Sequence, residues 1–209
     1  MRNGRLIGVM ALAMLSLALG GCEILYMLGG KGKQESQYKL SAKSRVLVWV
    51  DPRVTSGAPV DVPAALGEKV NGHLYQWKVS DHLVSQARLT ELRKDPRFTE
   101  MGVADAARKL DADVVVFIDL LQFRVETVSA GQLTQGHAQA LVKVVDRDGN
   151  RLWPADTEVL GVPVEADAKL SFADQATPAV VKDKMMADLT IRIGRLFHEY
   201  DLGDKEMIR

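Results

Sequence analysis

The chain has 209 residues, of which 27 are basic and 27 are acidic, so its formal net charge at pH 7 is zero. No basic run is long enough to form a nucleic-acid footprint, and we expect no nucleic-acid partner. The single cysteine, Cys22, rules out an internal disulfide, so the fold must rest on its own hydrophobic core.

The first residues have the pattern of an export signal. Arg2 and Arg5 form a short basic region, and residues 6–19 follow without a charged side chain. As a helix, these 14 residues would span about 21 Å, less than the roughly 30 Å of a bilayer core. That length is typical of the hydrophobic region of a signal peptide, so we predict a signal peptide at residues 1–21.

The tetrapeptide Leu19-Gly20-Gly21-Cys22 resembles the bacterial lipobox, in which an aliphatic residue and two small residues precede an obligate cysteine. The resemblance implies cleavage between Gly21 and Cys22 and a lipid on the Cys22 thiol. In that family an Asp after the cysteine favours inner-membrane retention, and Glu23 at this position mildly favours the outer membrane. The alternative is an ordinary signal peptide, or an uncleaved anchor, with an incidental cysteine.

Cleavage would leave residues 22–209, which are enough for one domain with a sizeable core. Without Arg2 and Arg5, 25 basic side chains would face 27 acidic ones. The stretch 29–44 is rich in Gly, Lys and Ser, which predicts a flexible, lipidated tether over residues 22–44. We place the folded, periplasmic domain at residues 45–203 and a C-terminal tail at 204–209.

The first half of this domain alternates strands and helices. Residues 45–50 are rich in β-formers and are followed by Asp51-Pro52, which predicts a strand. Apolar residues recur at helical spacing over 62–77, and Asp61 and Pro63 mark the start of that helix. The mixed pattern that follows favours a strand near residues 83–89, ahead of a short amphipathic helix at 103–110.

Three strands of the second half are predicted from apolar runs and turn residues. Residues 114–118 are five consecutive apolar β-formers, which indicates a strand covered on both faces near the sheet centre. Alternating apolar and polar residues continue it to Thr127, and a second alternating strand follows a turn at 129–132. Asp148-Gly149 predicts a hairpin turn into a strand at 151–153.

The last part of the chain combines a weak strand signal with a strong helix signal. Residues 159–164 favour a further strand. Thr177 suits an N-cap and Pro178 the first helical position, and an apolar stripe predicts a helix of roughly 24 residues that stops at Gly203. The order of elements predicts an α+β fold with a single mixed β-sheet packed against helices, including a long C-terminal helix.

Histidines and catalytic motifs give no site in the sequence. The four histidines lie far apart, share no metal-ligand spacing and are expected at exposed or half-buried positions: His73, His82, His137 and His198. No hydrolase or phosphate-binding motif is present. We therefore predict no catalytic, metal-binding or cofactor-binding residue, and the chain is not expected to be an enzyme.

Other polar and aromatic residues have structural explanations. Residues 146–150 begin like a calcium loop, but Arg151 and Thr157 stand where an EF-hand loop needs Gly and Glu, so a hairpin explains them better. Asp111 and Asp113 lie at a helix-to-strand turn, where aspartates commonly bond to the local backbone. Trp49 and Trp77 are expected in the core. Trp153 is expected in the core or at a sheet edge, and a binding role for it is left open.

Two segments carry a resemblance to a group of periplasmic proteins. ADAARKLDADVVVFIDLLQF, at 104–123, is similar to their small-residue helix followed by Ala-Asp and an apolar strand, and VKVVDRDGNRLW, at 142–153, is similar to their hairpin. The group includes the N-terminal domain of the Tol translocation protein B, curli secretion lipoproteins, and activator lipoproteins of penicillin-binding proteins. The resemblance implies a non-catalytic domain that acts through protein contacts.

Two functions follow as hypotheses. The first is a membrane-anchored cell-envelope lipoprotein that faces the periplasm, with the outer membrane favoured, and whose domain serves protein interaction or assembly with an envelope partner. The second is a lipid- or small-molecule-binding lipoprotein, which requires a pocket between sheet and helices. The sequence leaves the oligomeric state open.

Overall fold

A computed structural model of the chain describes residues 32–128, 133–156, 159–171 and 177–201. The chain divides into two compact units, which we describe separately. The described part of the smaller unit is a two-stranded antiparallel ladder, in which β1 (Lys33–Gln34) pairs with β7 (Tyr200–Asp201). This ladder was not predicted, because strands of two residues are too short to show a period.

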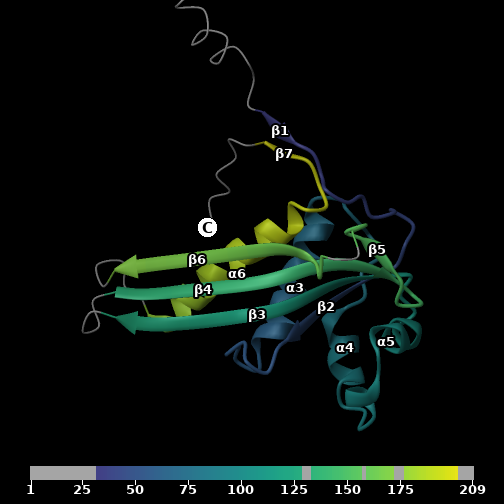
Figure 1. Ribbon diagram of the computed structural model, residues 1–209, viewed down its shortest axis with the longest axis horizontal. Coiled ribbons are helices and arrows are strands. Elements are labelled where there is room, and N and C mark those ends of the chain that lie inside the picture. The colour runs from purple at the N-terminus through teal and green to yellow at the C-terminus, as the bar shows by residue number, and fades with distance from the viewer. Residues whose placement is uncertain (1–31, 129–132, 157–158, 172–176, 202–209) are drawn as a thin grey trace, which may run out of the picture. The chain divides into compact units, whose positions relative to one another are not determined.

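The larger unit is built on a five-stranded mixed sheet (Figure 1). β2 (Val46–Pro52) pairs in parallel with β3 (Val114–Val128), and β3 pairs antiparallel with β4 (Leu133–Asp146). The other edge of β4 carries β5 (Arg151–Trp153) near one end and β6 (Val162–Ser171) along the rest. The predicted α+β fold with a mixed sheet is confirmed, and residues 114–118 lie between two strands, as expected.

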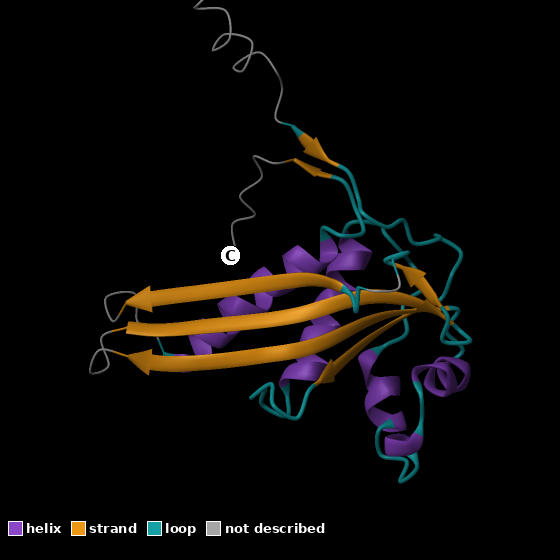
Figure 2. Cartoon of the chain, in the orientation of Figure 1, coloured by secondary structure: helices purple, strands orange, loops and turns teal. Residues whose placement is uncertain are grey.

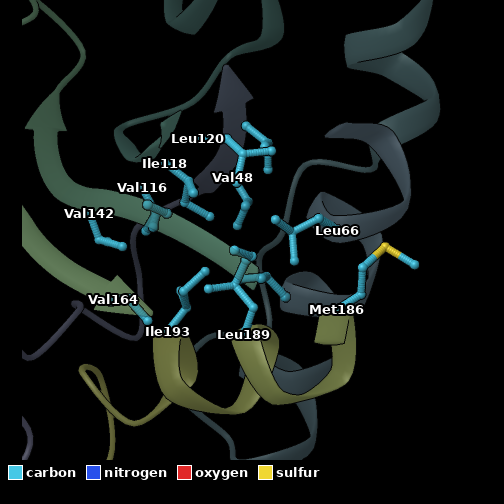
Figure 3. Packing of buried hydrophobic residues seen from close by; sticks show 14 of the residues in the cluster. Val48, Leu66, Val116, Ile118, Leu120, Val142, Val164, Met186, Leu189 and Ile193 are labelled. Carbon is cyan, nitrogen blue, oxygen red and sulfur yellow. The ribbon is translucent and has the colours of Figure 1, made fainter. Parts of the chain in front are cut away.

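Two helices cover one face of the sheet, which we call the inner face. α3 (Val62–Gln76) and α6 (Pro178–Gly194) pack on this face and on each other. Figure 3 shows side chains of both helices meeting those of β2, β3, β4 and β6, among them Leu66 and Leu189, which are fully buried. Burying a leucine of this kind stabilises the fold by about 1.5–3 kcal/mol relative to leaving it exposed, so this layer is the main core.

Three short elements cover part of the opposite, outer face. α4 (Gln86–Leu92), η1 (Phe98–Glu100) and α5 (Val103–Leu110) follow α3 in the chain, and together with it they form the crossover from β2 to β3 that a parallel pair requires. Trp49 is buried on this face, with its ring 5.5 Å from that of Phe98. A second, smaller core results, and it confirms the predicted burial of Trp49.

Two predicted elements were wrong in type or length. The strand favoured near 83–89 is largely helical, because α4 begins at Gln86, and Leu83 makes only an isolated bridge to Val46. The C-terminal helix has 17 residues and ends at Gly194, and the chain then turns so that Leu196 and Phe197 still reach the core. The apolar stripe thus continued past the helix end and made the helix look longer.

Smaller differences concern residues at the ends of elements. The strand favoured at 159–164 is β6, which begins at Val162 and runs to Ser171. Asp61 forms no side-chain cap on α3, and its carboxylate instead pairs with Lys182 of α6 at 3.0 Å. Thr177 does cap α6, since its hydroxyl accepts a bond from the Val180 amide. The predicted turn at 129–132 lies outside the described residues.

The segment before β2 also contributes to the larger unit. The amides of Gln37 and Tyr38 both donate to the Leu196 carbonyl, at 2.9 and 3.0 Å. Leu40 is buried in the main core, and the Tyr38 ring lies 6.0 Å from that of Trp153. Packing on the domain therefore starts ahead of residue 45, inside the stretch expected to be tether.

Candidate functional site

The sheet has a part that only three strands form, and we call it the three-stranded half: residues 122–128 of β3, 133–139 of β4 and 165–171 of β6. β2 ends at Pro52, opposite Leu120, whereas β3, β4 and β6 continue. Figure 2 shows these three strands running on beyond the end of β2. α6 covers their inner face. Among the described residues no helix covers their outer face.

A β-bulge sets which residues point outward in this half. The register between β3 and β4 shifts between Leu120 and Gln122, so Leu121 is the extra residue. Beyond it, polar side chains occupy the outer face in rows across the three strands. These rows are Gln122, Gln139 and Glu165; Arg124, His137 and Asp167; and Glu126, Gln135 and Lys169. All of these residues except Gln139 and Glu165 line a shallow hollow of about 290 Å³.

The charges on this surface are only partly paired. His137 Nδ1 lies 2.9 Å from Asp167 Oδ1 in the middle row. By contrast, Arg124, Glu126 and Lys169 are exposed and form no ion pair with any described residue. Exposed ion pairs contribute about 0–1 kcal/mol to stability, so these charged side chains matter little for the stability of the fold. They are free to interact with a binding partner.

Both edges of the three-stranded half expose strand backbone. Among the described residues, β6 pairs with β4 alone, and its other edge has no strand beside it (Figure 1). Pro163 near its start has no N–H to donate, as is usual in an edge strand. On the far side, the loop after β2 covers β3 only as far as Phe123, whose amide donates to the Ser56 carbonyl at 2.7 Å. Unpaired edges of this kind are templates for another chain.

An arginine marks the border between the covered and the open parts of the outer face. Arg53 follows β2, and its Nη2 donates to Asp119 Oδ2 of β3 at 2.7 Å, while its Nε donates to Oδ1 at 3.1 Å. This two-pronged geometry is the strong form of a guanidinium–carboxylate pair. It holds the end of β2 against β3 at the point where the three-stranded half begins.

The acidic motifs considered in the sequence make structural hydrogen bonds. Asp146 Oδ1 accepts from the amides of Asp148 and Asn150, and its bonds, led by that from the Asn150 side chain, hold the pKa of Asp146 below its ordinary value. Asp111 and Asp113 accept bonds from the side chain and the amide of Arg45, respectively. The hairpin therefore uses Asp146 locally, whereas the two aspartates of the helix-to-strand turn bond to a residue 66 and 68 positions earlier and not, as expected, to the local backbone.

Two of the four histidines meet, contrary to expectation. His73 of α3 and His198 lie with their Nε2 atoms 3.0 Å apart, and both side chains are buried, at 8% exposure each. The His198 ring stacks on Trp77 at 4.4 Å, and Trp77 is 38% exposed rather than in the core. The two positions are 125 residues apart, so sequence spacing could not reveal the pair. His82 is exposed and His137 half-buried, as predicted.

The histidine pair has the properties of a structural contact. Burial lowers the pKa of His73 to about 4, helped by the nearby His198 and Arg195. His198 Nδ1 lies 2.9 Å from the Glu199 carbonyl. No group of three or more His, Cys, Asp or Glu in the described parts of the chain could hold a metal ion. The pair therefore ties α3 to the segment after α6.

The residues of the predicted lipidation site, Gly21 and Cys22, lie outside the described residues. Within residues 32–128, 133–156, 159–171 and 177–201, no helix is long and apolar enough to cross a membrane.

Gly194 makes room for the histidine pair. A Cβ at this position would overlap the His73 ring, so we expect Gly194→Ala to lower the free energy of unfolding by about 1–3 kcal/mol. Gly72→Ala is the matched control, because it is also helical and a Cβ there meets nothing within 4 Å. The control should gain about 0.5–1 kcal/mol. Urea titrations measure both, and equal stability of the two variants would contradict the tight packing.

His73 should make stability depend on pH. Its pKa of about 4 in the folded state lies below the roughly 6.5 of an unfolded chain, so its contribution is complete above pH 6.5 and is lost as the pH falls toward 4. The wild type should lose up to about 3 kcal/mol more over this range than His73→Gln, which has no group to titrate. Urea unfolding midpoints of the wild type and of His73→Gln, measured between pH 7.5 and 4.5, give the comparison. The same pH dependence in both proteins would contradict the prediction.

Comparison with known proteins shows a likeness of fold. No family model matches the chain, and no curated protein matches it. Similar solved structures include the PelC dodecamer from Paraburkholderia phytofirmans, at 12% identity and a TM-score of 0.45, with 78% of this chain and 95% of that chain covered. Others are lipoprotein GNA1162 from Neisseria meningitidis (12% identity, TM-score 0.42, covering 65% and 88%) and a minor lipoprotein from Acinetobacter baumannii (12%, 0.41, covering 74% and 91%).

Proposed function

We propose that the chain is a cell-envelope lipoprotein, anchored by lipid on Cys22, whose α+β domain acts by binding proteins and not by catalysis. The observation that carries the proposal is the three-stranded half of the sheet. Its outer face is polar, no described helix covers that face, and both its edges expose backbone. A domain that only had to be stable would gain by covering these edges.

The anchor and the domain fit this role together. The first described pairing after Cys22 is that of Lys33 in β1, so a tether from Cys22 has about 11 residues and, at roughly 3.5 Å per residue, reaches at most about 40 Å. Exported domains on such a tether search a thin layer beside the membrane. We place the domain on the periplasmic side, with residues 1–21 removed. Because Glu23 follows Cys22, we place it at the outer membrane.

One observation favours the second candidate, a lipid- or small-molecule-binding lipoprotein. A hollow of about 510 Å³ lies between the edge of β3 and the start of α6, where Phe123, Val125 and Pro178 supply apolar surface. Its size is in the range of ligand sites. Because it adjoins an exposed strand edge and charged side chains, a protein partner fits it at least as well as a small ligand.

The anchor is tested by metabolic labelling with radioactive palmitate. The wild-type chain should carry label and Cys22→Ser should carry none, because no other thiol is present. The double variant Cys22→Ser/Ser41→Cys is the matched control, since it restores a cysteine outside the tetrapeptide 19–22. Label on either variant would contradict the lipidation of Cys22.

The interaction surface is tested by site-specific photocrosslinking of the full chain in intact cells. A photoreactive residue at Gln135 or Glu126, on the open outer face, should give adducts with protein. The same residue at Glu91 of α4, which is also exposed but lies elsewhere, should give few. Adducts at Glu91 alone, or at none of the positions, would contradict a protein-binding role. Adducts with lipid or a small molecule near Val125 would favour the second candidate.

A further inference from the structure

We propose that the partner on the two open edges is a second copy of this chain: the free edge of β6 in one copy pairs in parallel with the free edge of β3 in the next. The inference deepens the proposed function and rests on it, since it names the partner of the same surface. It is carried by two features of the edges: the backbone direction, which also sets the side-chain face, and the order of the charges.

The backbone direction on β3 follows from one hydrogen bond. The Phe123 amide donates to Ser56, outside the sheet, so it points away from β4. Because backbone groups in a strand alternate in direction, Val125 and Thr127 also point their N–H and C=O groups to this edge. The loop containing Ser56 ends the covered stretch, which leaves Val125 and Thr127 for a new strand.

The direction on β6 follows from the register across the sheet. Arg124 is opposite His137, and since Phe123 points away from β4, the pair Arg124–His137 is the one that exchanges hydrogen bonds. His137 therefore points away from β6, and its opposite residue, Asp167, points away from β4 toward the free edge. By the same alternation, Lys169 directs its N–H and C=O groups outward.

A parallel pair can be formed from these two edges in a register that satisfies backbone and faces at once. In a parallel ladder, a residue that points to the partner lies opposite one that points away. Asp167 opposite the second copy's Arg124 meets this rule, and so does Lys169 opposite its Glu126. All four side chains stand on the outer face, while Ala168 and Val125 meet on the apolar inner face.

Charge order selects this register among its neighbours. It opposes Asp167 to Arg124 and Lys169 to Glu126, so both pairs attract. A shift of two residues one way brings Asp167 opposite Glu126, which repel, and Glu165 opposite Arg124, which attract; a shift the other way brings Lys169 opposite Arg124, which repel. The proposed register has two attractive pairs and no repulsive one, and it gives partners to Arg124, Glu126 and Lys169, which form no ion pair among the described residues.

The two edges differ, so the contact is head-to-tail. Each pairing leaves one free β3 edge and one free β6 edge, and further copies add to form a closed ring or an open row. An antiparallel β6–β6 dimer also opposes Asp167 to Lys169, but it leaves Arg124, Glu126 and the β3 edge without partners. The paired stretch is short, so the contact is weak in dilute solution and depends on the high local concentration of tethered copies on a membrane.

The test uses the full chain in its membrane, with Arg124→Cys and Asp167→Cys in the same chain. Mild oxidation should give a ladder of disulfide-linked multimers on a non-reducing gel, because opposed residues of adjacent strands lie within reach of a disulfide. Each single cysteine variant has one free thiol and can link at most two copies, and neither it nor the wild type with Cys22 alone should give disulfide-linked species. A disulfide-linked dimer from Asp167→Cys alone would point to β6–β6 contact and overturn the proposal.

Charge reversals in this double-cysteine chain test the register. Lys169→Glu or Glu126→Lys alone should lower multimer yield about fivefold, since each opposes like charges. The two reversals together in one chain, or a mixture of the two single reversals, should restore it, because each again opposes unlike charges. Loss of yield for Lys169→Glu with none for Glu126→Lys would contradict the pairing.

The outcome for self-pairing is separate from that for the proposed function. If the double-cysteine chain stays monomeric in the membrane while photocrosslinks from Gln135 to other envelope proteins persist, the self-pairing is wrong and the protein-binding role stands. If neither multimers nor crosslinks form, both are wrong.

Discussion

The antiparallel pairing of β3 with β4 fixes the position of every other element in the larger unit. It runs from Val114 opposite Asp146 to Val128 opposite Leu133, interrupted by one bulge at Leu121. β2 attaches to the first part of β3, whereas β5 and β6 share the far edge of β4. Because side chains alternate along each strand, this one register decides which residues reach the core and which stay outside.

The same pairing extends beyond what the rest of the domain can cover. Over the first part of β3, the sheet is covered by helices on both faces and held at the end of β2 by Arg53 and Asp119. Beyond that point α6 covers the inner face, and the outer face carries charges in rows. The stability of the domain and its availability to a partner are thus provided by different parts of one long hairpin.

The elements with a clear period or turn were predictable from the sequence. Residues 114–118 showed a central strand, Asp148-Gly149 a hairpin, and Thr177-Pro178 a helix start, because each depends on local chemistry alone. The end of α6 and the helical state of residues 86–92 were missed, since there apolar residues serve tertiary packing and not a single period.

The candidate site was less visible from the sequence, for a physical reason. Alternation along 121–127 did show a polar face, but only the bulge at Leu121 and the pairing with β6 bring Arg124, His137 and Asp167 into one row. The contact of His73 with His198 depends on the packing of α3 and α6, which spacing does not encode. Long-range strand register and helix packing therefore could not be predicted from the sequence.

The central claim is that the edges of the three-stranded half are open in the single domain and closed by a second copy of the chain. Residue-resolved amide hydrogen exchange, measured on the full chain at low and at high density in vesicles, tests it most directly. The amides of Asp167, Lys169, Val125 and Thr127 should exchange fast at low density and become protected at high density. Those of Ala166 and Ala168, which point to β4, should be protected in both. Edge amides with the same exchange rates at both densities would contradict the account.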